Sequence, residues 1–309
     1  MFLLKKTIRI GTRDSELALW QAHTVQKKLT DLGYETEIIA VKSTGDLILD
    51  KPLYELGITG IFTKTLDVAM LKGQVDIAVH SMKDVPTTLP NGIIQAAVLE
   101  RANVYDILVH KGNLDFLESK GTIASGSLRR KAQWLHKYPT HTVEDLRGNV
   151  NTRLQKLKDN TWNGAIFAAA GLERINLKPD TYINLDWMIP APAQGAMLVV
   201  AMESDIFSQE ALSHLNHTET EICTHIERQF LKTLEGGCTA PIGALAKVYD
   251  ETIHFEGVLH SLDGKENYTI KKSCNFEDYK SFGKDCAQEI LNNGGHFLME
   301  KLRTALKVK

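Results

Sequence analysis

The sequence predicts an α/β fold of two lobes joined by a two-strand hinge, followed by a small C-terminal α+β domain. Two successive series of strand, polar turn and helix occupy residues 1–195, and a Pro- and Gly-rich run ends the second series. The last third instead shows a helix, three strands and two more helices. At 309 residues the chain suits two or three domains, each able to bury a core.

The composition is that of an ordinary globular chain, with 43% hydrophobic and 24% charged residues, a net charge of −2 and a pI near 6.6. This balance argues against a nucleic-acid partner. No apolar run approaches the ~20 residues that span a bilayer, and residues 1–6 lead into a strand without a signal-peptide core. We therefore expect a cytoplasmic protein without a membrane partner.

The chain contains four cysteines, Cys223, Cys238, Cys274 and Cys286. None belongs to a C-x-x-C pair or has a His at ligand spacing, so we expect no metal site. In a reducing compartment these cysteines should be free thiols.

The first lobe begins with a strand at Thr7–Gly11, followed by a polar turn and an amphipathic helix that Gly33 ends. This unit places Arg13 and Ser15 at a helix N-terminus, where backbone N–H groups favour anions. Each residue also has a simpler interpretation, Ser15 as a helix cap and Arg13 as a surface charge. A second strand at Glu37–Val41 and a glycine-rich segment, expected to be mobile over Leu47–Gly60, follow.

The stretch from Val75 to Pro86 organises this lobe. It starts as an apolar run and turns polar at His80, which predicts a buried parallel strand that delivers Lys83 and Asp84 to its carboxyl end. Ligands bind at these ends in open α/β sheets. A lone carboxylate there is usually a cap or a surface residue, but an Asp beside a Lys and before Pro86 favours a site.

The second lobe is marked by arginines at its turns. Ser125 and Ser127 cap a helix whose first turn carries Arg129 and Arg130, where a positive charge opposes the helix dipole. From residue 129 to 158 there are eight Lys or Arg and two acids. Solvated helix faces explain the lysines well but explain Arg129, Arg130, Arg147 and Arg153 poorly. Because guanidinium groups suit bidentate carboxylate or phosphate capture, the expected ligand is a small polyanion.

The remaining chain completes the domain organisation. A strand at Ala165–Ala169 turns out toward Arg174, and Ile189–Ala196 is predicted to be the return crossing of the two-strand hinge. Two crossings give the architecture of two-lobed, periplasmic-binding-protein-like folds. We assign the predicted domains by residue number: domain 1, 1–100 and 196–215; domain 2, 101–195; domain 3, 216–309.

In the third domain, Cys238 follows two glycines and precedes Pro241, so it lies on a loop and not in a core strand. Most cysteines are buried packing residues, but this position favours an exposed and positioned thiol.

These motifs together resemble the porphobilinogen deaminase (hydroxymethylbilane synthase) family. The resemblance covers the first two lobes almost throughout and the third mainly at the cysteine loop. It rests on six segments in the family's order: Ile8–Leu19, Val79–Pro86, Gly126–Arg130, Leu146–Asn149, Gln194–Ala196 and Glu235–Cys238.

The resemblance implies a monomeric transferase of tetrapyrrole and heme biosynthesis. Its substrate would be porphobilinogen, four molecules of which are added stepwise to a dipyrromethane cofactor on Cys238, with release of ammonia and of the product hydroxymethylbilane. Asp84 would be the catalytic carboxylate. The other implied contacts are, for the cofactor, Lys83, Asp84, Ser125, Ser127, Arg129, Arg130 and Arg147, and for the substrate, Arg13, Ser15, Arg153, Arg174 and Gln194.

The chain departs from the family pattern at two places. Thr59 stands where the family commonly has a Lys, with Thr44 near a position that is often basic, and Pro192–Ala193 replaces the usual Val-Gly. The competing interpretation is a non-catalytic two-lobed receptor for a small dicarboxylate, which would use the arginines but not Cys238 or Asp84. A nucleic-acid binder is disfavoured because no aromatic residues interleave with the basic cluster.

Overall fold

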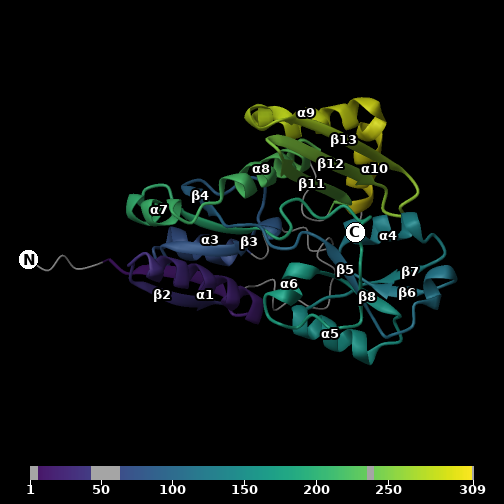
Figure 1. Ribbon diagram of the computed structural model, residues 1–309, viewed down its shortest axis with the longest axis horizontal. Coiled ribbons are helices and arrows are strands. Elements are labelled where there is room, and N and C mark those ends of the chain that lie inside the picture. The colour runs from purple at the N-terminus through teal and green to yellow at the C-terminus, as the bar shows by residue number, and fades with distance from the viewer. Residues whose placement is uncertain (1–5, 43–62, 235–239, 308–309) are drawn as a thin grey trace, which may run out of the picture. The chain divides into compact units, whose positions relative to one another are not determined.

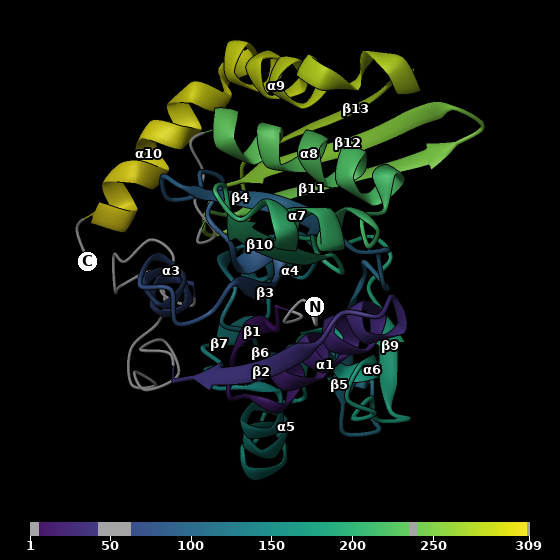
Figure 2. The ribbon, with the colours of Figure 1, turned by 90° about the vertical axis from the view of Figure 1, so that its left-hand side faces the viewer.

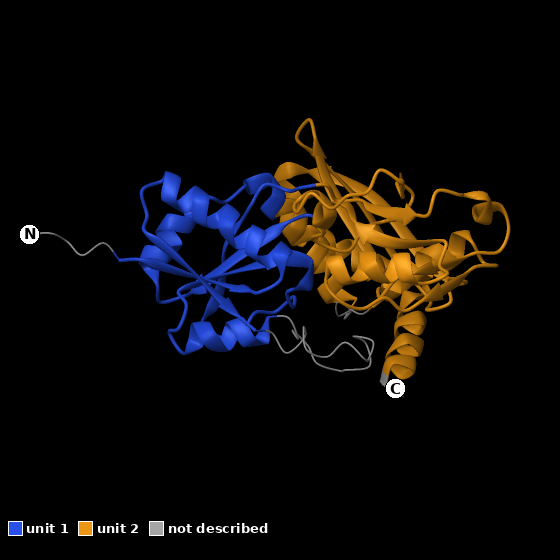
Figure 3. Ribbon diagram, turned by 90° about the horizontal axis from the view of Figure 1, so that it is seen from below, with its two compact units in different colours: residues 1–48, 58–102, 195–221 blue, residues 49–57, 103–194, 222–309 orange. Residues whose placement is uncertain are grey.

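The computed structural model describes residues 6–42, 63–234 and 240–307, and these contain three β-sheets (Figure 1). The described residues form two compact units (Figure 3). Unit 1 comprises 6–42, 63–102 and 195–221, and unit 2 comprises 103–194, 222–234 and 240–307. No helix among them is long and apolar enough to cross a membrane. The segment Leu47–Gly60, for which we predicted mobility, lies outside the described residues.

Unit 1 contains a five-stranded sheet of order β2-β1-β3-β10-β4. β1 runs parallel to β2 and β3, whereas β10 runs antiparallel to β3 and β4. The strands are β1 (Ile8–Arg13), β2 (Thr36–Val41), β3 (Ile77–Ser81), β4 (Ile93–Val98) and β10 (Met197–Met202). The helices are α1 (Glu16–Asp31), α3 (Lys64–Leu71) and α7 (Ile206–Ser213).

The second sheet, in unit 2, has the order β7-β6-β8-β5-β9. β6 is parallel to β7 and β8, and β5 is antiparallel to β8 and β9. Its strands are β5 (Asp106–His110), β6 (Thr122–Ala124), β7 (Thr142–Glu144), β8 (Gly164–Ala168) and β9 (Tyr182–Asn184). Its helices are α4 (Leu128–Lys137), α5 (Val150–Asp159) and α6 (Ala169–Glu173).

The two sheets share one topology. In each, three parallel strands, numbered by their order in the chain, stand side by side as second, first, third, and an antiparallel strand follows. That strand starts shortly after the chain enters the unit, at Gly195 for β10 and at Asn103 for β5. The predicted pair of α/β lobes is therefore confirmed.

Amphipathic patterning explains how α1 packs against β1 in unit 1. Ala22, Val25 and Leu29 of α1 recur at helical spacing and are completely buried against Ile8 and Ile10 of β1. Because β1 runs parallel to β2 and β3, the carboxyl ends of all three strands lie at a common edge of the sheet.

The third sheet is antiparallel, of order β11-β12-β13, and belongs to unit 2. Figure 2 shows α8 lying across these strands. Phe230 of α8 packs so closely that a Cβ at Gly257 would lie 2.6 Å from its ring. The elements are α8 (Thr218–Thr233), β11 (Ile242–Tyr249), β12 (Thr252–His260), β13 (Asn267–Asn275), α9 (Tyr279–Ile290) and α10 (His296–Lys307). The predicted α+β domain is confirmed, and a turn at Gly264, whose φ is +74°, joins β12 to β13.

Candidate functional site

The carboxyl end of β3 places Asp84 on a short, well-anchored turn. A 3-10 turn over Met82–Asp84 follows the strand directly. Met82 and Val85 are buried, and the N–H of Val85 donates to the Met82 carbonyl at 3.2 Å. Lys83 and Asp84 between them are half-buried. The turn thus holds the carboxylate at a defined place with part of its surface accessible.

The neighbouring strand β1 delivers Arg13 and Ser15 to the same edge of the sheet. Arg13 is the last residue of β1, which runs parallel to β3. Ser15 caps α1 by accepting a hydrogen bond from the N–H of Ala18 at 3.4 Å. The buried Thr12 hydroxyl fixes the same helical turn by donating to the Ala18 carbonyl at 2.9 Å. The interpretation of Ser15 as a helix cap is confirmed, and its contact with a ligand stays a prediction.

His80 is a buried imidazole beside these residues. Burial, together with the nearby positive charge of Arg13, lowers its pKa to about 4. The ring is therefore neutral at physiological pH. The adjacent Ser81 hydroxyl accepts a hydrogen bond from Gln21 of α1 at 2.9 Å, which ties the end of β3 to the helix.

In unit 2 the carboxyl end of β6 continues into a turn formed by residues 125–127. Ser127 caps α4, and the Ser125 hydroxyl accepts from the N–H of Ser127 at 3.3 Å. A Cβ at Gly126 would collide with the Leu146 carbonyl oxygen, so only glycine lets these two loops meet. This close approach brings Arg147 beside the turn. The structure thereby gathers Ser125, Ser127 and Arg147 at one edge of the sheet.

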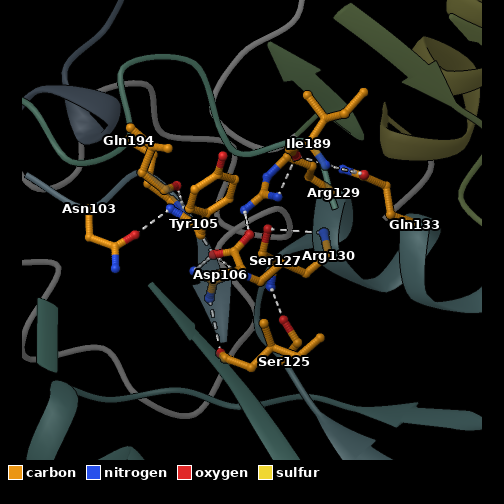
Figure 4. Close-up of polar contacts among 12 residues, drawn as sticks. Asn103, Tyr105, Asp106, Ser125, Ser127, Arg129, Arg130, Gln133, Ile189 and Gln194 are labelled. Carbon is orange, nitrogen blue, oxygen red and sulfur yellow. Dashed lines mark hydrogen bonds and ion pairs between the residues drawn. The ribbon is translucent and has the colours of Figure 1, made fainter. Parts of the chain in front are cut away.

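Arg129 and Arg130 share a single buried carboxylate, Asp106 (Figure 4). Arg130 donates to Asp106 Oδ1 from Nε at 3.1 Å and from Nη2 at 2.7 Å, and its Nη1 donates to the Ile166 carbonyl. Arg129 Nη2 lies 2.8 Å from Asp106 Oδ2, and its Nη1 donates to the Ile189 carbonyl. Both arginines are buried, in agreement with the expectation that they are not solvated surface charges.

Gln194 belongs to the same group. Its side-chain amide donates to Asp106 Oδ1 and to the Val104 carbonyl, both at 2.9 Å. Arg153 lies farther along α5, where its Nε donates to the Gly148 carbonyl at 2.7 Å. Arg174 is half-buried directly after α6, the helix that follows β8. These two arginines are thus near the ends of parallel strands but outside the Asp106 cluster.

Two buried carboxylates were not singled out by the sequence. Asp106 opens β5, where an acid looks like an ordinary strand-end residue. Glu227 lies within α8 and accepts from the N–H groups of Ala193 at 2.6 Å and Ala246 at 2.8 Å. Ala193 has a φ of +61°, a conformation that favours glycine, at the position where the family usually has Gly. An acid inside the otherwise apolar stripe of α8 was the available signal for Glu227.

The arginines in unit 2 suit an anionic ligand that carries carboxylates. Two guanidinium groups share one carboxylate at Asp106, and Arg129 Nε is buried without a hydrogen-bond partner among the described residues. Burial lowers the pKa of Arg129 and of Arg147, and it lowers the pKa of Arg174 to about 10. A bound carboxylate would favour the charged form of each. The side chains present therefore fit a ligand such as dipyrromethane.

The burial and the pKa of the described cysteines show which of their thiols are suited to react. Cys238 lies outside the described residues. Among the described cysteines, Cys223 and Cys286 are buried and Cys274 is half-buried, and none of the three forms a disulfide. Burial raises the pKa of Cys274, and it raises that of Cys286 to about 12. Neither of these two thiols is suited to act as a nucleophile at neutral pH.

Two family models match this chain. The model described as "Porphobilinogen deaminase, dipyromethane cofactor binding domain" matches residues 8–210, and "Porphobilinogen deaminase, C-terminal domain" matches residues 221–292. The chain belongs to the porphobilinogen deaminase family. Members of this family are transferases that make hydroxymethylbilane in tetrapyrrole biosynthesis, so the interpretation as a dicarboxylate receptor is not favoured.

Similar porphobilinogen deaminases occur in plants and bacteria. The chloroplastic enzyme of Oryza sativa subsp. japonica is 42% identical over 309 residues, which cover 96% of this chain and 86% of the relative. The Chloroherpeton thalassium protein is 38% identical, covering 97% of this chain and 99% of its own length. The Syntrophomonas wolfei protein is 39% identical, with coverage of 96% and 99%.

Proposed function

We propose that this chain condenses four porphobilinogen molecules on a dipyrromethane primer attached to Cys238, with Asp84 as the catalytic carboxylate. The observation that carries the assignment of Asp84 is its place on the turn that ends β3, anchored by Met82 and Val85 on either side. The family match supplies the reaction, and the geometry supports the choice of residue.

Asp84 acts on the charge that develops during the reaction. As ammonia leaves porphobilinogen, positive charge builds on the carbon that carried it, and a fixed carboxylate stabilises that charge. The carboxylate does not reorganise when the charge appears, because the short turn already fixes it. Arg13, at the same edge of the sheet, binds the acetate and propionate groups of porphobilinogen, and Ser15 adds a hydroxyl to that contact. Lys83 binds a carboxylate of the cofactor.

When bound, dipyrromethane supplies the pyrrole carbon to which the first substrate is joined. Its carboxylates are held by Arg129, Arg130 and Arg147, with the Ser125 and Ser127 hydroxyls as further donors. Arg153, Arg174 and Gln194 contact the substrate units added later. This assignment is supported by the lowered pKa of Arg147 and Arg174, whose charge a ligand carboxylate would stabilise.

The proposal also includes a monomer in the cytoplasm with three domains, bounded at 1–100 with 196–215, 101–195, and 216–309. The three separate sheets support the division, as does the change of family model between residues 210 and 221. Sedimentation velocity of the loaded protein tests the monomer, and cell fractionation tests the location. A stable dimer or a membrane-bound pool would contradict these parts.

The intact mass of the purified protein tests the proposed function. We expect one discrete increment equal to a dipyrromethane on the wild-type chain and none on Cys238→Ser, which should fold because the substitution is a small isostere at a position that the sequence predicts to lie on a loop. Cys274→Ser is the matched control and should keep both the increment and the activity. An increment that persists in Cys238→Ser would overturn the attachment site, and a wild-type chain without turnover of porphobilinogen would overturn the function.

A further inference from the structure

Asp106 contacts three residues to which the proposed function gives a role, Arg129, Arg130 and Gln194, although it has no role there itself. It is 0% exposed, and both of its oxygens are engaged. Oδ1 accepts from Arg130 and from Gln194, and Oδ2 pairs with Arg129. Figure 4 shows the carboxylate between these side chains.

The antiparallel direction of β5 explains how this carboxylate reaches the edge. Asp106 is the first residue of β5 and pairs with Ala168, the last residue of β8. Because β8 is parallel to β6, the start of β5 lies at the edge where β6 delivers Ser125. The acid is thus placed among the arginines by the topology of the sheet, across a long separation in the sequence.

The contacts of the two arginines are unequal. All three side-chain nitrogens of Arg130 have partners, two contacts going to Asp106 and one to the Ile166 carbonyl. Arg129 is held through Nη1 and Nη2 alone, and its buried Nε has no hydrogen-bond partner in the described part of the chain. A buried donor without a partner is costly, and a ligand carboxylate would remove that cost.

We propose that Asp106 is a positioning residue that holds Arg129 and Arg130 so that Arg129 keeps donors for a carboxylate of the cofactor or substrate. This inference rests on the proposed function. Asp106 also lowers the net charge of the buried cluster, so that two guanidinium groups can share one site. It does not touch the ligand itself.

A purely structural ion pair in unit 1 provides the matched control. Asp76 precedes β3 and accepts from Arg9 Nε at 3.0 Å and Nη2 at 2.7 Å, much as Asp106 accepts from Arg130. The pair lies at the amino end of the strand, away from Asp84 at the carboxyl end. If Asp106 were only structural, Asp106→Asn and Asp76→Asn should have the same kinds of effect.

Asp106→Asn tests the proposal at the level of single atoms. The amide oxygen can still accept from Arg130 and Gln194, whereas the new NH₂ group opposes the Arg129 Nη2 donor. At a temperature where circular dichroism shows a folded protein, we expect a smaller fraction of chains with the cofactor mass. In the loaded chains, KM for porphobilinogen should rise about 10- to 100-fold, the range for one lost hydrogen bond to a charged group. Asp76→Asn should lower the melting temperature and leave both quantities unchanged.

Asp106→Glu covers the case in which Asp106→Asn does not fold. It keeps the charge but moves the carboxylate by about one bond, so loading should fall and KM should rise in a folded protein. Normal loading and KM in either folded Asp106 variant would overturn the inference. The proposed function would stand in that case, since it is judged on the wild-type mass and turnover.

Discussion

The sheets of the two units have the same strand order, but the side chains at their carboxyl ends differ in charge. In both, a serine caps the helix that follows the first of the three parallel strands, Ser15 for α1 after β1 and Ser127 for α4 after β6. The first turn of α1 then carries Glu16, which suits the helix dipole, whereas that of α4 carries Arg129 and Arg130, which oppose it. The buried Asp106 offsets this arrangement.

The difference shows how one scaffold serves two tasks. Parallel strands bring loop residues to a common edge in either unit, and the sequence of the loop decides the chemistry. In unit 1 the edge carries Asp84 on the turn after β3, and His80 within β3 is neutral. In unit 2 it presents guanidinium groups whose burial is unfavourable without an anion. Substitutions at the edge of unit 1 should therefore lower the rate, whereas those at the edge of unit 2 should raise KM and lower cofactor loading.

The largest effect should come from Asp84→Asn. It keeps the shape of the side chain and removes the charge, so the steady-state rate should fall by roughly 10²–10³-fold, as for the loss of one preorganised electrostatic partner. Asp84→Glu keeps the charge at a displaced position and should retain more activity than Asn. If Asp84→Glu were the slower of the two, shape and not charge would be the decisive property.

His80 should make the protein sensitive to acid. Its folded-state pKa of about 4 is below the ordinary value near 6.5, so only the unfolded chain binds the proton between these values. Stability is therefore lost as pH falls through this window, by at most about 3 kcal/mol. Urea unfolding of His80→Gln at pH 7 and pH 4.5 should show a shallower loss than the wild type. Equal losses would show that the imidazole is protonated in the folded state.

A smaller effect on catalysis is expected from Arg147→Gln. In our proposal the buried guanidinium binds a ligand carboxylate and does not act on the reacting carbon, so we expect KM to rise and cofactor loading to fall, by about tenfold. The rate at saturating substrate should change little in the loaded fraction. Lys158→Gln, an exposed position on α5, is the matched control and should behave as wild type. If Arg147→Gln lowered the rate at saturating substrate and left KM and cofactor loading unchanged, the proposed difference between the edges of unit 1 and unit 2 would be contradicted.

The smallest effect is expected from alkylation of Cys274 in β13 and Cys286 in α9. Burial raises the pKa of Cys274 and Cys286, so at pH 7.5 iodoacetamide should leave both unmodified in the folded protein. Peptide mapping after brief alkylation measures this. Rapid labelling of Cys286 would show that α9 opens locally, because the side chain is buried against the sheet in the closed state.

Much of the fold could be predicted because its elements are locally periodic. The spacing of apolar residues in α1 and the abrupt end of the apolar run at His80 fixed the first lobe and the position of Asp84. Gly126 and the serine cap Ser127 marked the turn between β6 and α4, because a cap is also a local signal.

What escaped prediction depends on contacts between distant residues. Asp106 meets Arg130 across 24 positions and Gln194 across 88, and no local period records such pairs. The strands β7 and β9 span three residues each, too few to show alternation. The pyrrole chemistry likewise came from the family resemblance, since arginines and one carboxylate specify only a polyanion.

The central claim is that the edge of unit 1 acts on the reacting carbon while the edge of unit 2 holds carboxylates. Single-turnover kinetics on cofactor-loaded Asp84→Asn and Arg147→Gln, with bound intermediates counted by mass, test it most directly. We predict that Asp84→Asn carries the full primer mass and is slow at every addition, whereas Arg147→Gln adds its first unit at near the wild-type rate once substrate is saturating. If Asp84→Asn turned over at near the wild-type rate, Asp84 would be a structural cap and the account would be contradicted.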